Sequence, residues 1–496
     1  MKGSFIMMVV VVVSLLNCYV ECEGCLEEEK SLLLQLKSSL NRSIESSVAL
    51  SDWAGQNCCE WGGVSCSNTT SRVFKLLLGT VGQEGPDVLN SKESVNILAQ
   101  FKELQYLVLS GNRMGGSDIL QAFCKMHHLK LLLLYSTSLE GKIPHCIRKM
   151  HSLQVLNLAG NQLQGNIPLS TFSDMHLLQE LDLSGNQLQG IISPFTFSNM
   201  HSLQKLDLSE NQLQEIISPS TFNNLTMLTD LSLSNNHFVG TIPFSMFANL
   251  SKLVSLDLSN NYQLEVETES PNWVPHFRLT NLNLANCKLN RLSGSIVPSF
   301  LSTQHTLKFL DLSNSSLAGY IPSYLLYNST QRLVLRRNSL SGPFPLPHQN
   351  TTSLLTALDI SNNLVNGSLP ENFVDLFPLL VYCDMSANAL QGNLPPKMGI
   401  GNLQFLSLSD NRFYGEMPPG LMKCINMGYL VLSNNRLQGE MLPGNVSMEG
   451  LVCLELDGNE FTTPPNISKT PYLVILNIRN NHLSGNISLG CLCISI

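Results

Sequence analysis

Charged residues are scarce in this sequence of 496 residues. Lys, Arg, Asp and Glu make up 13% of it, against about 25% in an average soluble domain. The net charge of -8 is modest and negative, which argues against nucleic acid as a partner, because such partners require concentrated positive charge. Hydration of the surface must therefore depend largely on asparagine, serine and attached sugars.

Long apolar runs are also missing. The longest is the twelve-residue stretch from Phe5 to Leu16, interrupted only by Ser14, whereas a membrane-spanning helix needs about 20 apolar residues. Behind Lys2 this stretch is typical of a secretory signal, which we predict at residues 1–24. We therefore expect an extracellular chain with no transmembrane segment of its own.

Motifs for chemistry are lacking as well. The sequence contains no nucleophile elbow, no phosphate-binding loop and no Cys/His quartet with the spacing of a metal site. We expect neither an enzyme nor a cofactor, and no metal.

What the sequence has instead is a repeat of about 24 residues, LxxLxLxxNxLxGxIP, which occurs sixteen times between Leu104 and Ile487. A clear copy is LQVLNLAGNQLQGNIP, from Leu153. In such a leucine-rich repeat each turn lays a short strand beside the next, and no turn is stable alone. Alternation along the strand sends Leu156 and Leu158 inward, so every turn leaves one row of side chains exposed.

The asparagine of the repeat follows the strand, where the backbone bends and its buried polar groups need partners. An amide side chain both donates and accepts, so we predict a buried ladder of these residues. Its rungs are Asn112, Asn161, Asn186, Asn211, Asn236, Asn261, Asn338, Asn363, Asn388, Asn411, Asn435, Asn459 and Asn481, with Thr137, Cys287 and Ser315 in three other repeats. The GxIP segment, as at Gly165, predicts a tight turn on the convex side.

A separate cap precedes the repeats. Three consecutive glutamates from Glu27 stand ahead of an apolar stripe and predict a helix, because the helix dipole favours acidic residues at its N-terminus. The predicted domains are the signal at 1–24, the cap at 25–72, a first strand and irregular entry segment at 73–103, the repeats at 104–487 and a short tail at 488–496.

The cysteines fall into two groups. An oxidising compartment favours disulfides within the cap, whose cysteines are Cys25, Cys58, Cys59 and Cys66. Because Cys58 and Cys59 are adjacent, we expect two bridges that reach outward from them. The cysteines of the repeats are expected to be buried and to act as small hydrophobic residues, namely Cys124, Cys146, Cys287, Cys383, Cys424 and Cys453.

Eleven N-x-S/T sequons support an extracellular location. They begin at Asn41, Asn68, Asn224, Asn249, Asn314, Asn328, Asn350, Asn366, Asn445, Asn466 and Asn486. Repeats rich in asparagine and serine also generate sequons by chance, so we expect roughly half of them to carry a glycan.

One outward column of the repeats is a candidate binding surface. It consists of the residue just before the first inward position of each strand, and in the C-terminal half it reads Phe309, Arg332, Ala357, Tyr382, Phe405, Tyr429 and Cys453. Aromatic and arginine side chains are common interface anchors, and neighbouring strands place them about 5 Å apart. We predict that the column binds a ligand. The alternative is that large aromatics pack together on a sheet face without a binding role.

Three arginines of one repeat add to this candidate. Arg332, Arg336 and Arg337 could hold a carboxylate or a sulfated group through paired N–H donors. The alternative is a solvated cluster that is neutralised by Asp311 and Asp359 on neighbouring strands.

Two other periodic features have simpler explanations. The outward position between the two inward strand residues is acidic in seven repeats, Asp182, Asp207, Asp257, Asp311, Asp359, Asp384 and Glu455. Acid–base catalysis by carboxylates needs a cleft and unequal environments, so these repeated copies favour a structural role. Four histidines recur at spacings of 24 or 25, His127, His151, His176 and His201. They could respond to mildly acidic pH, but duplication of the repeat explains them equally well.

The sequence resembles the plant leucine-rich-repeat receptor-like proteins, which are extracellular receptors without a kinase. The resemblance rests on GCLEEEKSLLLQLKSSL in the cap, on CCEWGGVSC followed by RVFKL, and on the GxIP form of the repeat. It implies an α/β solenoid, a leucine-rich-repeat superhelix with a parallel concave sheet and a disulfide-capped helical cap. It also implies a plasma-membrane location, and signalling through partner receptor kinases. Members of that family continue into further repeats and a membrane helix, so we expect this chain to be a C-terminally truncated form.

Two functions are therefore considered. The first is an extracellular receptor of plant defence or development that recognises a peptide, glycan or protein on its concave face, with a co-receptor kinase as a second partner. The second is a secreted inhibitor of a cell-wall-degrading enzyme, similar to the polygalacturonase inhibitor proteins, which share the cap and the repeat. The sixteen repeats favour the receptor, since those inhibitors are shorter.

Overall fold

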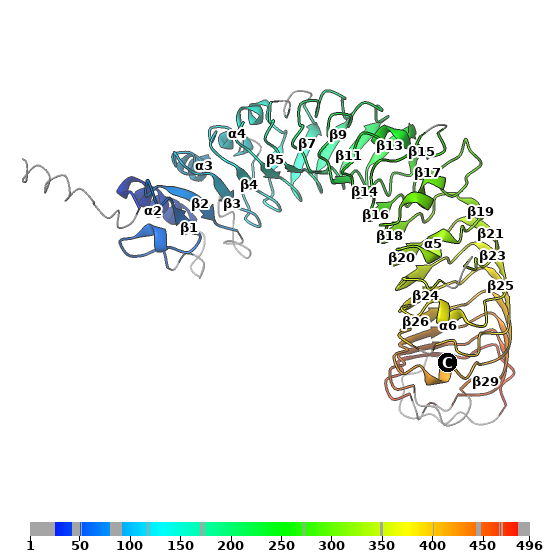
Figure 1. The fold of residues 1–496 in the computed structure, drawn as a ribbon. Coiled ribbons are helices and arrows are strands. Elements are labelled where there is room, and N and C mark those ends of the chain that lie inside the picture. Colours follow the sequence, from blue (N-terminus) through cyan, green and yellow to red (C-terminus); the bar gives the residue numbers. More distant parts are fainter. Residues whose placement is uncertain are drawn as a thin grey trace, which may run out of the picture. The chain divides into compact units, whose positions relative to one another are not determined.

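The computed structural model describes residues 25–41, 50, 52–79, 92–116, 119–168, 172, 174–270, 273–347, 351–399, 401–442, 448–465, 467 and 470–484. It divides the chain into two compact units, Met1–Gln212 and Leu213–Ile496, which are drawn as a ribbon in Figure 1. The expected signal at 1–24 and tail at 488–496 lie outside the described residues. Among those residues, no helix combines the length and the apolar character needed to cross a membrane.

The first unit begins with the cap helix α2, Glu27–Asn41, whose first turn is acidic as expected. Its apolar stripe is buried, and Leu33 and Leu36 are fully inaccessible to solvent. Glu29 is also buried, because its carboxylate accepts a hydrogen bond from the backbone N–H of Val73 at 2.6 Å. Arg72 lies 3.3 Å from the same carboxylate. The third glutamate therefore joins the helix to the first strand, a role that the sequence pattern did not reveal.

Two disulfides close the cap, Cys25–Cys58 and Cys59–Cys66. These are the outward bridges expected from the adjacent cysteines. The first joins Cys25, two residues before α2, to the short helix η2, Cys58–Glu60. The second joins η2 to strand β1, Val64–Cys66. Strand β1 pairs antiparallel with β2, Val73–Leu77, which starts the parallel series of the repeats.

The main sheet consists of one three-residue strand from each repeat, paired in parallel with its neighbours. In the first unit these strands are β3 (Tyr106–Val108), β4 (Leu131–Leu133), β6 (Val155–Asn157), β8 (Glu180–Asp182) and β10 (Lys205–Asp207). The inward leucines stack in register, as shown by the pairing of Leu132 with Leu156. Leu156 and Leu158 are fully buried, whereas Val155 is partly exposed. The alternation predicted for the strand is confirmed.

In the second unit the main sheet continues the same pattern. Its strands are β12 (Asp230–Ser232), β14 (Ser255–Asp257), β16 (Asn281–Asn283), β18 (Phe309–Asp311), β20 (Arg332–Val334), β22 (Ala357–Asp359), β24 (Tyr382–Asp384), β26 (Phe405–Ser407), β28 (Tyr429–Val431), β30 (Cys453–Glu455) and β32 (Ile475–Asn477). Along the chain, short helices precede several strands of the main sheet. Across both units they are α3 (Lys92–Leu98), α4 (Ile119–Phe123), η3 (His145–Lys149), η4 (Phe244–Phe247), η5 (Ser299–Thr303), α5 (Tyr324–Tyr327), α6 (Phe373–Leu376) and η6 (Leu421–Lys423).

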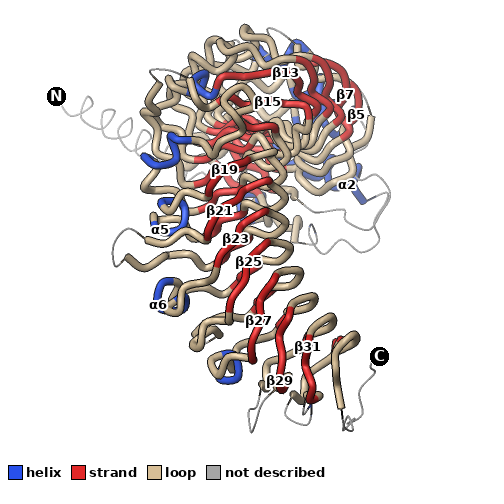
Figure 2. Tube along the Cα trace, turned by 90° about the vertical axis from the view of Figure 1, so that its right-hand side faces the viewer, coloured by secondary structure: helices blue, strands red, loops and turns tan. Residues whose placement is uncertain are grey.

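A second set of parallel strands follows the asparagine rung, where the sequence predicted only a tight turn. Figure 2 shows these strands stacked beside one another along the second unit. They are β5 (Glu140–Gly141), β7 (Gln162–Asn166), β9 (Gln187–Gly190), β11 (Gln212–Glu215), β13 (His237–Pro243), β15 (Gln263–Glu267), β17 (Lys288–Leu289), β19 (Ala318–Tyr320), β21 (Ser339–Pro343), β23 (Leu364–Gly367), β25 (Ala389–Gly392), β27 (Arg412–Glu416), β29 (Arg436–Glu440) and β31 (Glu460–Thr463). The segment QLQGN in β7 alternates between exposed and buried residues, which is the period of a strand. Gly165 still bends the chain at a φ of 80°.

The asparagine ladder is present as predicted. Asn161 donates from Nδ2 to the carbonyls of Leu134 and Leu158, at 2.8 and 2.9 Å, and its Oδ1 accepts from the N–H of Leu139. The substitutes in three other repeats also donate to a backbone carbonyl. Thr137 Oγ1 bonds Leu134 of its own repeat, whereas Cys287 Sγ and Ser315 Oγ bond a leucine carbonyl of the preceding repeat. The ladder thus satisfies buried backbone groups of two successive repeats at once.

One expectation for the repeat cysteines is wrong. Cys124 and Cys146 form a disulfide with their Cα atoms 5.7 Å apart, rather than two separate buried thiols. They are 22 residues apart, close to one repeat length, so they occupy the same place beside α4 and η3 in successive turns. In the described part of the chain Cys287, Cys383, Cys424 and Cys453 are free and buried, as expected.

The six sequon asparagines whose side chains the structure describes lie at the surface. Asn68, Asn224, Asn249, Asn314 and Asn366 are exposed, and Asn328 is partly exposed. Asn350, Asn445, Asn466 and Asn486 lie outside the described residues, as does the side chain of Asn41.

Candidate ligand-binding surface

The predicted outward column lies in the second unit on six neighbouring strands of the main sheet. Pairing of β18 to β28 places its members directly beside one another, in the order Phe309, Arg332, Ala357, Tyr382, Phe405, Tyr429. We refer to these six residues as the column. Each stands one position before a buried residue, so the alternation of the strand turns it away from the core. Cys453 continues the register beyond Tyr429, but it is buried.

Three aromatic rings of the column form a stack. The rings of Tyr382 and Phe405 lie 4.4 Å apart between centroids and are tilted by only 11°. Tyr429 follows at 6.0 Å from Phe405, with an angle of 38°, and is 45% exposed. Burial raises the pKa of the Tyr382 phenol to about 12, aided by the nearby Asp384. The Tyr382 phenol is therefore uncharged at physiological pH.

At the other end of the column, Arg332 lies over the ring of Phe309. Its guanidinium carbon is 5.6 Å from the ring centroid, which is within the range of a cation–π interaction. Arg332 is nonetheless exposed. This contact orients a planar cationic group on the outer surface of the sheet.

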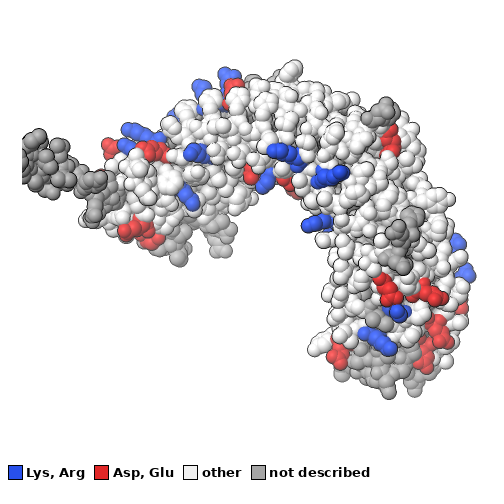
Figure 3. Space-filling view, viewed as in Figure 1, with Lys and Arg blue, Asp and Glu red and all other residues white. Residues whose placement is uncertain are grey.

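A hollow of about 320 Å³ separates these two parts of the column. It is lined by Asp311, Arg332, Leu333, Val334, Arg336, Ala357, Asp359 and Tyr382. Five of these are charged or carry a phenol, and the other three are small or aliphatic and form its apolar surface. The hollow thus brings both signs of charge against an aromatic face. Most of the molecular face drawn in Figure 3 is uncharged.

The arginines of this repeat do not act as one cluster. Arg332 and Arg336 line the hollow, and Arg337 is not among its lining residues. Arg337 occupies the turn after the strand, at a φ of 55°, and its backbone N–H donates to the carbonyl of Ser361. Arg336 extends toward Asp359, with 4.0 Å between Nε and the carboxylate oxygen Oδ2. Its side chain remains 53% exposed, so this ion pair holds Arg336 only loosely.

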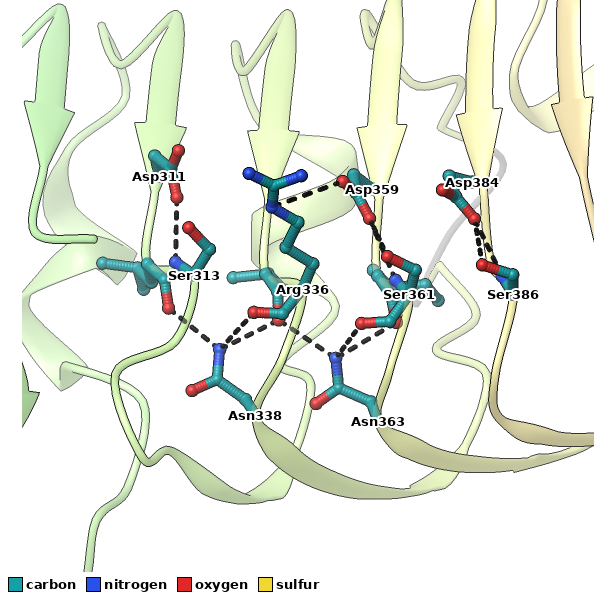
Figure 4. A network of polar contacts seen from close by, with 12 residues as sticks. Asp311, Ser313, Arg336, Asn338, Asp359, Ser361, Asn363, Asp384 and Ser386 are labelled. Carbon is teal, nitrogen blue, oxygen red and sulfur yellow. Dashed lines mark hydrogen bonds and ion pairs between the residues drawn. The ribbon is translucent and has the colours of Figure 1, made fainter. Parts of the chain in front are cut away.

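The carboxylates of this region serve the backbone. Oδ1 of Asp359 accepts from both the N–H and the hydroxyl of Ser361, at 3.0 and 2.6 Å, as Figure 4 shows. Asp384 makes the same pair of bonds to Ser386. Burial raises the pKa of Asp384, and the bonds from Ser386 act in the opposite direction. The first unit repeats the arrangement at Asp182 and Asp207, which supports the structural explanation of the acidic row.

The histidine row is also tied to the backbone. Nδ1 of His127, His151 and His176 lies 3.2 to 3.4 Å from a carbonyl of the next repeat. A carbonyl only accepts, so each ring donates its Nδ1–H. These bonds link successive turns on the exposed side of the first unit and give the row a structural role.

Comparison with known families agrees with the repeat pattern. Residues 88–317 match the family described as a leucine-rich repeat region, 26–67 match a leucine-rich repeat N-terminal domain, and 402–424 match a further leucine-rich repeat. Among curated proteins, Cuscuta receptor 1 of Solanum lycopersicum is 38% identical over 157 residues, and Receptor-like protein 13 of Arabidopsis thaliana is 37% identical over 168 residues.

These alignments cover about a third of this chain, at 31% and 33%, and only 14% and 15% of the two relatives. The chain thus spans a small part of the length of the curated relatives that it matches.

Solved structures with the same architecture cover far more of the chain. The ectodomain of the plant membrane receptor kinase GASSHO1/SCHENGEN3 from Arabidopsis thaliana, solved with CASPARIAN STRIP INTEGRITY FACTOR 2, has a TM-score of 0.75 and 29% identity. The match covers 91% of this chain and 56% of that one. The Arabidopsis receptor kinase HAESA, solved with the peptide hormone IDA and the co-receptor SERK1, has a TM-score of 0.68 and 25% identity. That match covers 93% of this chain and 87% of that one.

The repeat, the disulfide-bearing cap and these similarities lead to one assignment. The chain is a leucine-rich-repeat protein that is similar to the plant leucine-rich-repeat receptor-like proteins.

Proposed function

We propose that this chain is the ligand-binding part of an extracellular plant receptor of defence or developmental signalling, and that it binds a peptide across the column and the adjoining hollow. The observation that carries the proposal is the hollow itself, where Arg332, Arg336 and Tyr382 meet on the exposed face of the sheet. Three disulfides among the described residues favour an oxidising, extracellular environment.

A peptide suits this surface better than a purely anionic or purely apolar ligand. The aromatic stack offers apolar contact area with little conformational entropy to lose. Arg332 and Arg336 supply N–H donors for a carboxylate or a sulfate. The nearby carboxylates of Asp311 and Asp359 can accept hydrogen bonds from donor groups of the peptide. A peptide presents apolar side chains, donors and acceptors at short intervals along one chain, and so fits a surface of mixed character.

The relatives support a peptide ligand by analogy. Two of the solved ectodomains were crystallised with a peptide hormone or an integrity factor bound, and one of them with a co-receptor as well. By the same analogy we propose that a receptor kinase is the signalling partner of this chain. A glycan or a folded protein as the ligand is a different outcome of the experiment that follows.

The proposal is tested with a triple variant, Y382A/F405A/Y429A. Random peptides displayed on phage are selected against the wild-type protein, and the affinity of the enriched peptides is measured by calorimetry. We expect the triple variant to bind them roughly 100-fold more weakly, because three central aromatic anchors are lost. The matched control is Y320A/Y414A, which removes two exposed tyrosines of the second set of strands.

Equal binding by the wild-type and the triple variant would show that the column is not the site. Enrichment of plant wall oligosaccharides from a glycan array, with no peptide enriched, would replace the peptide with a glycan. Circular dichroism confirms that both variants keep the fold.

A further inference from the structure

The column is a stack of planar groups with one member missing. Phe309 and Arg332 form one part of the stack, and Tyr382, Phe405 and Tyr429 form the other. The strand between the two parts contributes Ala357, which pairs with Arg332 on one side and with Tyr382 on the other. The hollow exists because a methyl group stands where its neighbours have large planar side chains.

The planar groups on both sides of the gap have a face available. Phe405 covers one face of the Tyr382 ring from the next strand, β26, in a nearly parallel arrangement. Ala357 lies on the opposite side of Tyr382, so the second face of that ring is turned toward the gap. Likewise Phe309 lies beneath the guanidinium of Arg332 on the side away from Ala357.

The width of the gap matches one aromatic ring. Neighbouring strands lie about 4.8 Å apart, so two steps place the planes of Arg332 and Tyr382 about 9.6 Å apart. A ring halfway between them would lie about 4.8 Å from each, within the distances preferred by aromatic pairs and by cation–π pairs. An aliphatic side chain would fill the same space but would gain neither interaction.

The edge of the gap supplies a hydrogen-bond acceptor. Asp359 is two residues after Ala357 on the same strand, so its side chain lies on the same face of the sheet. Its Oδ1 is already bonded to Ser361. Its Oδ2 lies 4.0 Å from Arg336 Nε, which is longer than a hydrogen bond. Figure 4 shows this carboxylate beside the extended side chain of Arg336.

We propose that the gap over Ala357 is a specificity pocket for one aromatic side chain of the ligand. The ring, from a tyrosine or a tryptophan, stacks between Arg332 and Tyr382 and donates a hydrogen bond to Asp359. This inference rests on the proposed function and names the ligand group that the hollow selects. Ala357 is the specificity-determining residue, because any larger side chain there would occupy the pocket.

The first test uses small probes and one substitution. N-acetyltyrosinamide, N-acetyltryptophanamide and N-acetylleucinamide are titrated into the wild-type protein, and binding is followed by saturation-transfer NMR. We expect both aromatic probes to bind at least about fivefold more tightly than the leucine probe. In A357F the added ring fills the pocket, so aromatic binding is lost while the melting temperature stays the same or rises. The matched control is A389F, the same substitution on β25, which leaves binding unchanged.

Several results would overturn the inference. These are equal binding of the leucine and aromatic probes, no binding of either aromatic probe, or aromatic binding that survives in A357F. If A357F does not fold, D359N gives an independent measurement. That variant retains binding of N-acetylphenylalaninamide but loses the preference for the tyrosine probe over it, and an unchanged preference would remove Asp359 from the pocket.

The peptide selection separates this inference from the proposed function. Peptides that bind the column but contain no aromatic residue, and that bind A357F as well as the wild type, would overturn the pocket and leave the receptor proposal standing. If the aromatic probes bind the gap but no displayed peptide binds the column, the pocket stands and the proposal of a peptide receptor is overturned.

Discussion

At the scale of single residues, Cys287 shows how one position of the repeat tolerates different chemistry. It occupies an asparagine rung, and its thiol donates to the carbonyl of Leu258 at 3.1 Å. Burial is the main reason that the pKa of this thiol rises to about 12, from an ordinary value near 9. Burial also raises the pKa of Cys383. These thiols remain protonated at neutral pH and behave as small buried groups.

The raised pKa predicts a pH dependence of stability. The folded state holds the Cys287 proton up to about pH 12, whereas the unfolded state releases it near pH 9. The contribution to stability is therefore complete below pH 9 and is lost as the pH rises from 9 toward 12, by roughly 1 kcal/mol per pH unit. Urea unfolding of the wild type and of C287S, at pH 8 and at pH 10.5, measures the difference. C287S keeps a donor at this position and does not titrate, so an identical pH dependence in the two proteins would contradict the prediction.

At the scale of secondary-structure elements, the short helices and the second set of strands fill the space that the main sheet leaves open. Phe244 in η4 contacts Phe247 and Phe300 at centroid distances of 5.4 and 4.8 Å. In the first unit the disulfide Cys124–Cys146 adds a covalent link between α4 and η3. Segments this short have little helical stability of their own, so they depend on such contacts.

Removal of that link should loosen this part of the first unit. The bridge closes a loop of 22 residues, for which loop-closure entropy predicts a contribution of about 3 kcal/mol. In C124A/C146A we expect a comparable loss of unfolding free energy, together with faster amide hydrogen exchange in α4 and η3. The control is C424A, which removes a buried thiol that is not in a disulfide. A loss no larger than that of C424A would mean that the bridge adds nothing beyond its buried volume.

At the scale of the whole molecule, stability arises between neighbouring turns. Asn363 donates to the carbonyls of Leu335 and Ile360, which belong to successive repeats, and its Oδ1 accepts from the N–H of Leu340. It is 6% exposed. Each rung therefore couples one repeat to the previous one, and the stack behaves as a series of nearest-neighbour interactions.

Loss of one rung should accordingly act locally. N363A leaves three carbonyls and one N–H without their side-chain partner, at a cost of about 2 to 4 kcal/mol. Hydrogen exchange measured by mass spectrometry should show lost protection in the repeats around β20 and β22, with little change in the first unit. The control is Q391A, at an exposed position of β25. Uniform loss of protection along the chain would show that the molecule unfolds as one cooperative body instead.

Much of this architecture is determined by short-range patterns, and so could be predicted. The burial of Leu156 and Leu158 follows from alternation along one strand, and the outward bridges of Cys58 and Cys59 follow from their adjacency. The order of the column follows from alignment of the repeats on their asparagines. In each case the constraint acts between residues close in sequence, or the same residue pattern recurs from one repeat to the next.

Only the tertiary structure decided how side chains from different repeats meet. The sequence determined that the column contains Arg332, Ala357 and Tyr382, but the orientation of the Tyr382 ring depends on Phe405 one strand away. Tertiary packing likewise determines that Arg336 lines the hollow and Arg337 does not, that Cys124 pairs with Cys146, and that Glu29 is buried. The physical reason is that side-chain rotamers and long-range pairs respond to packing against neighbouring turns, which a pattern read along one chain does not contain.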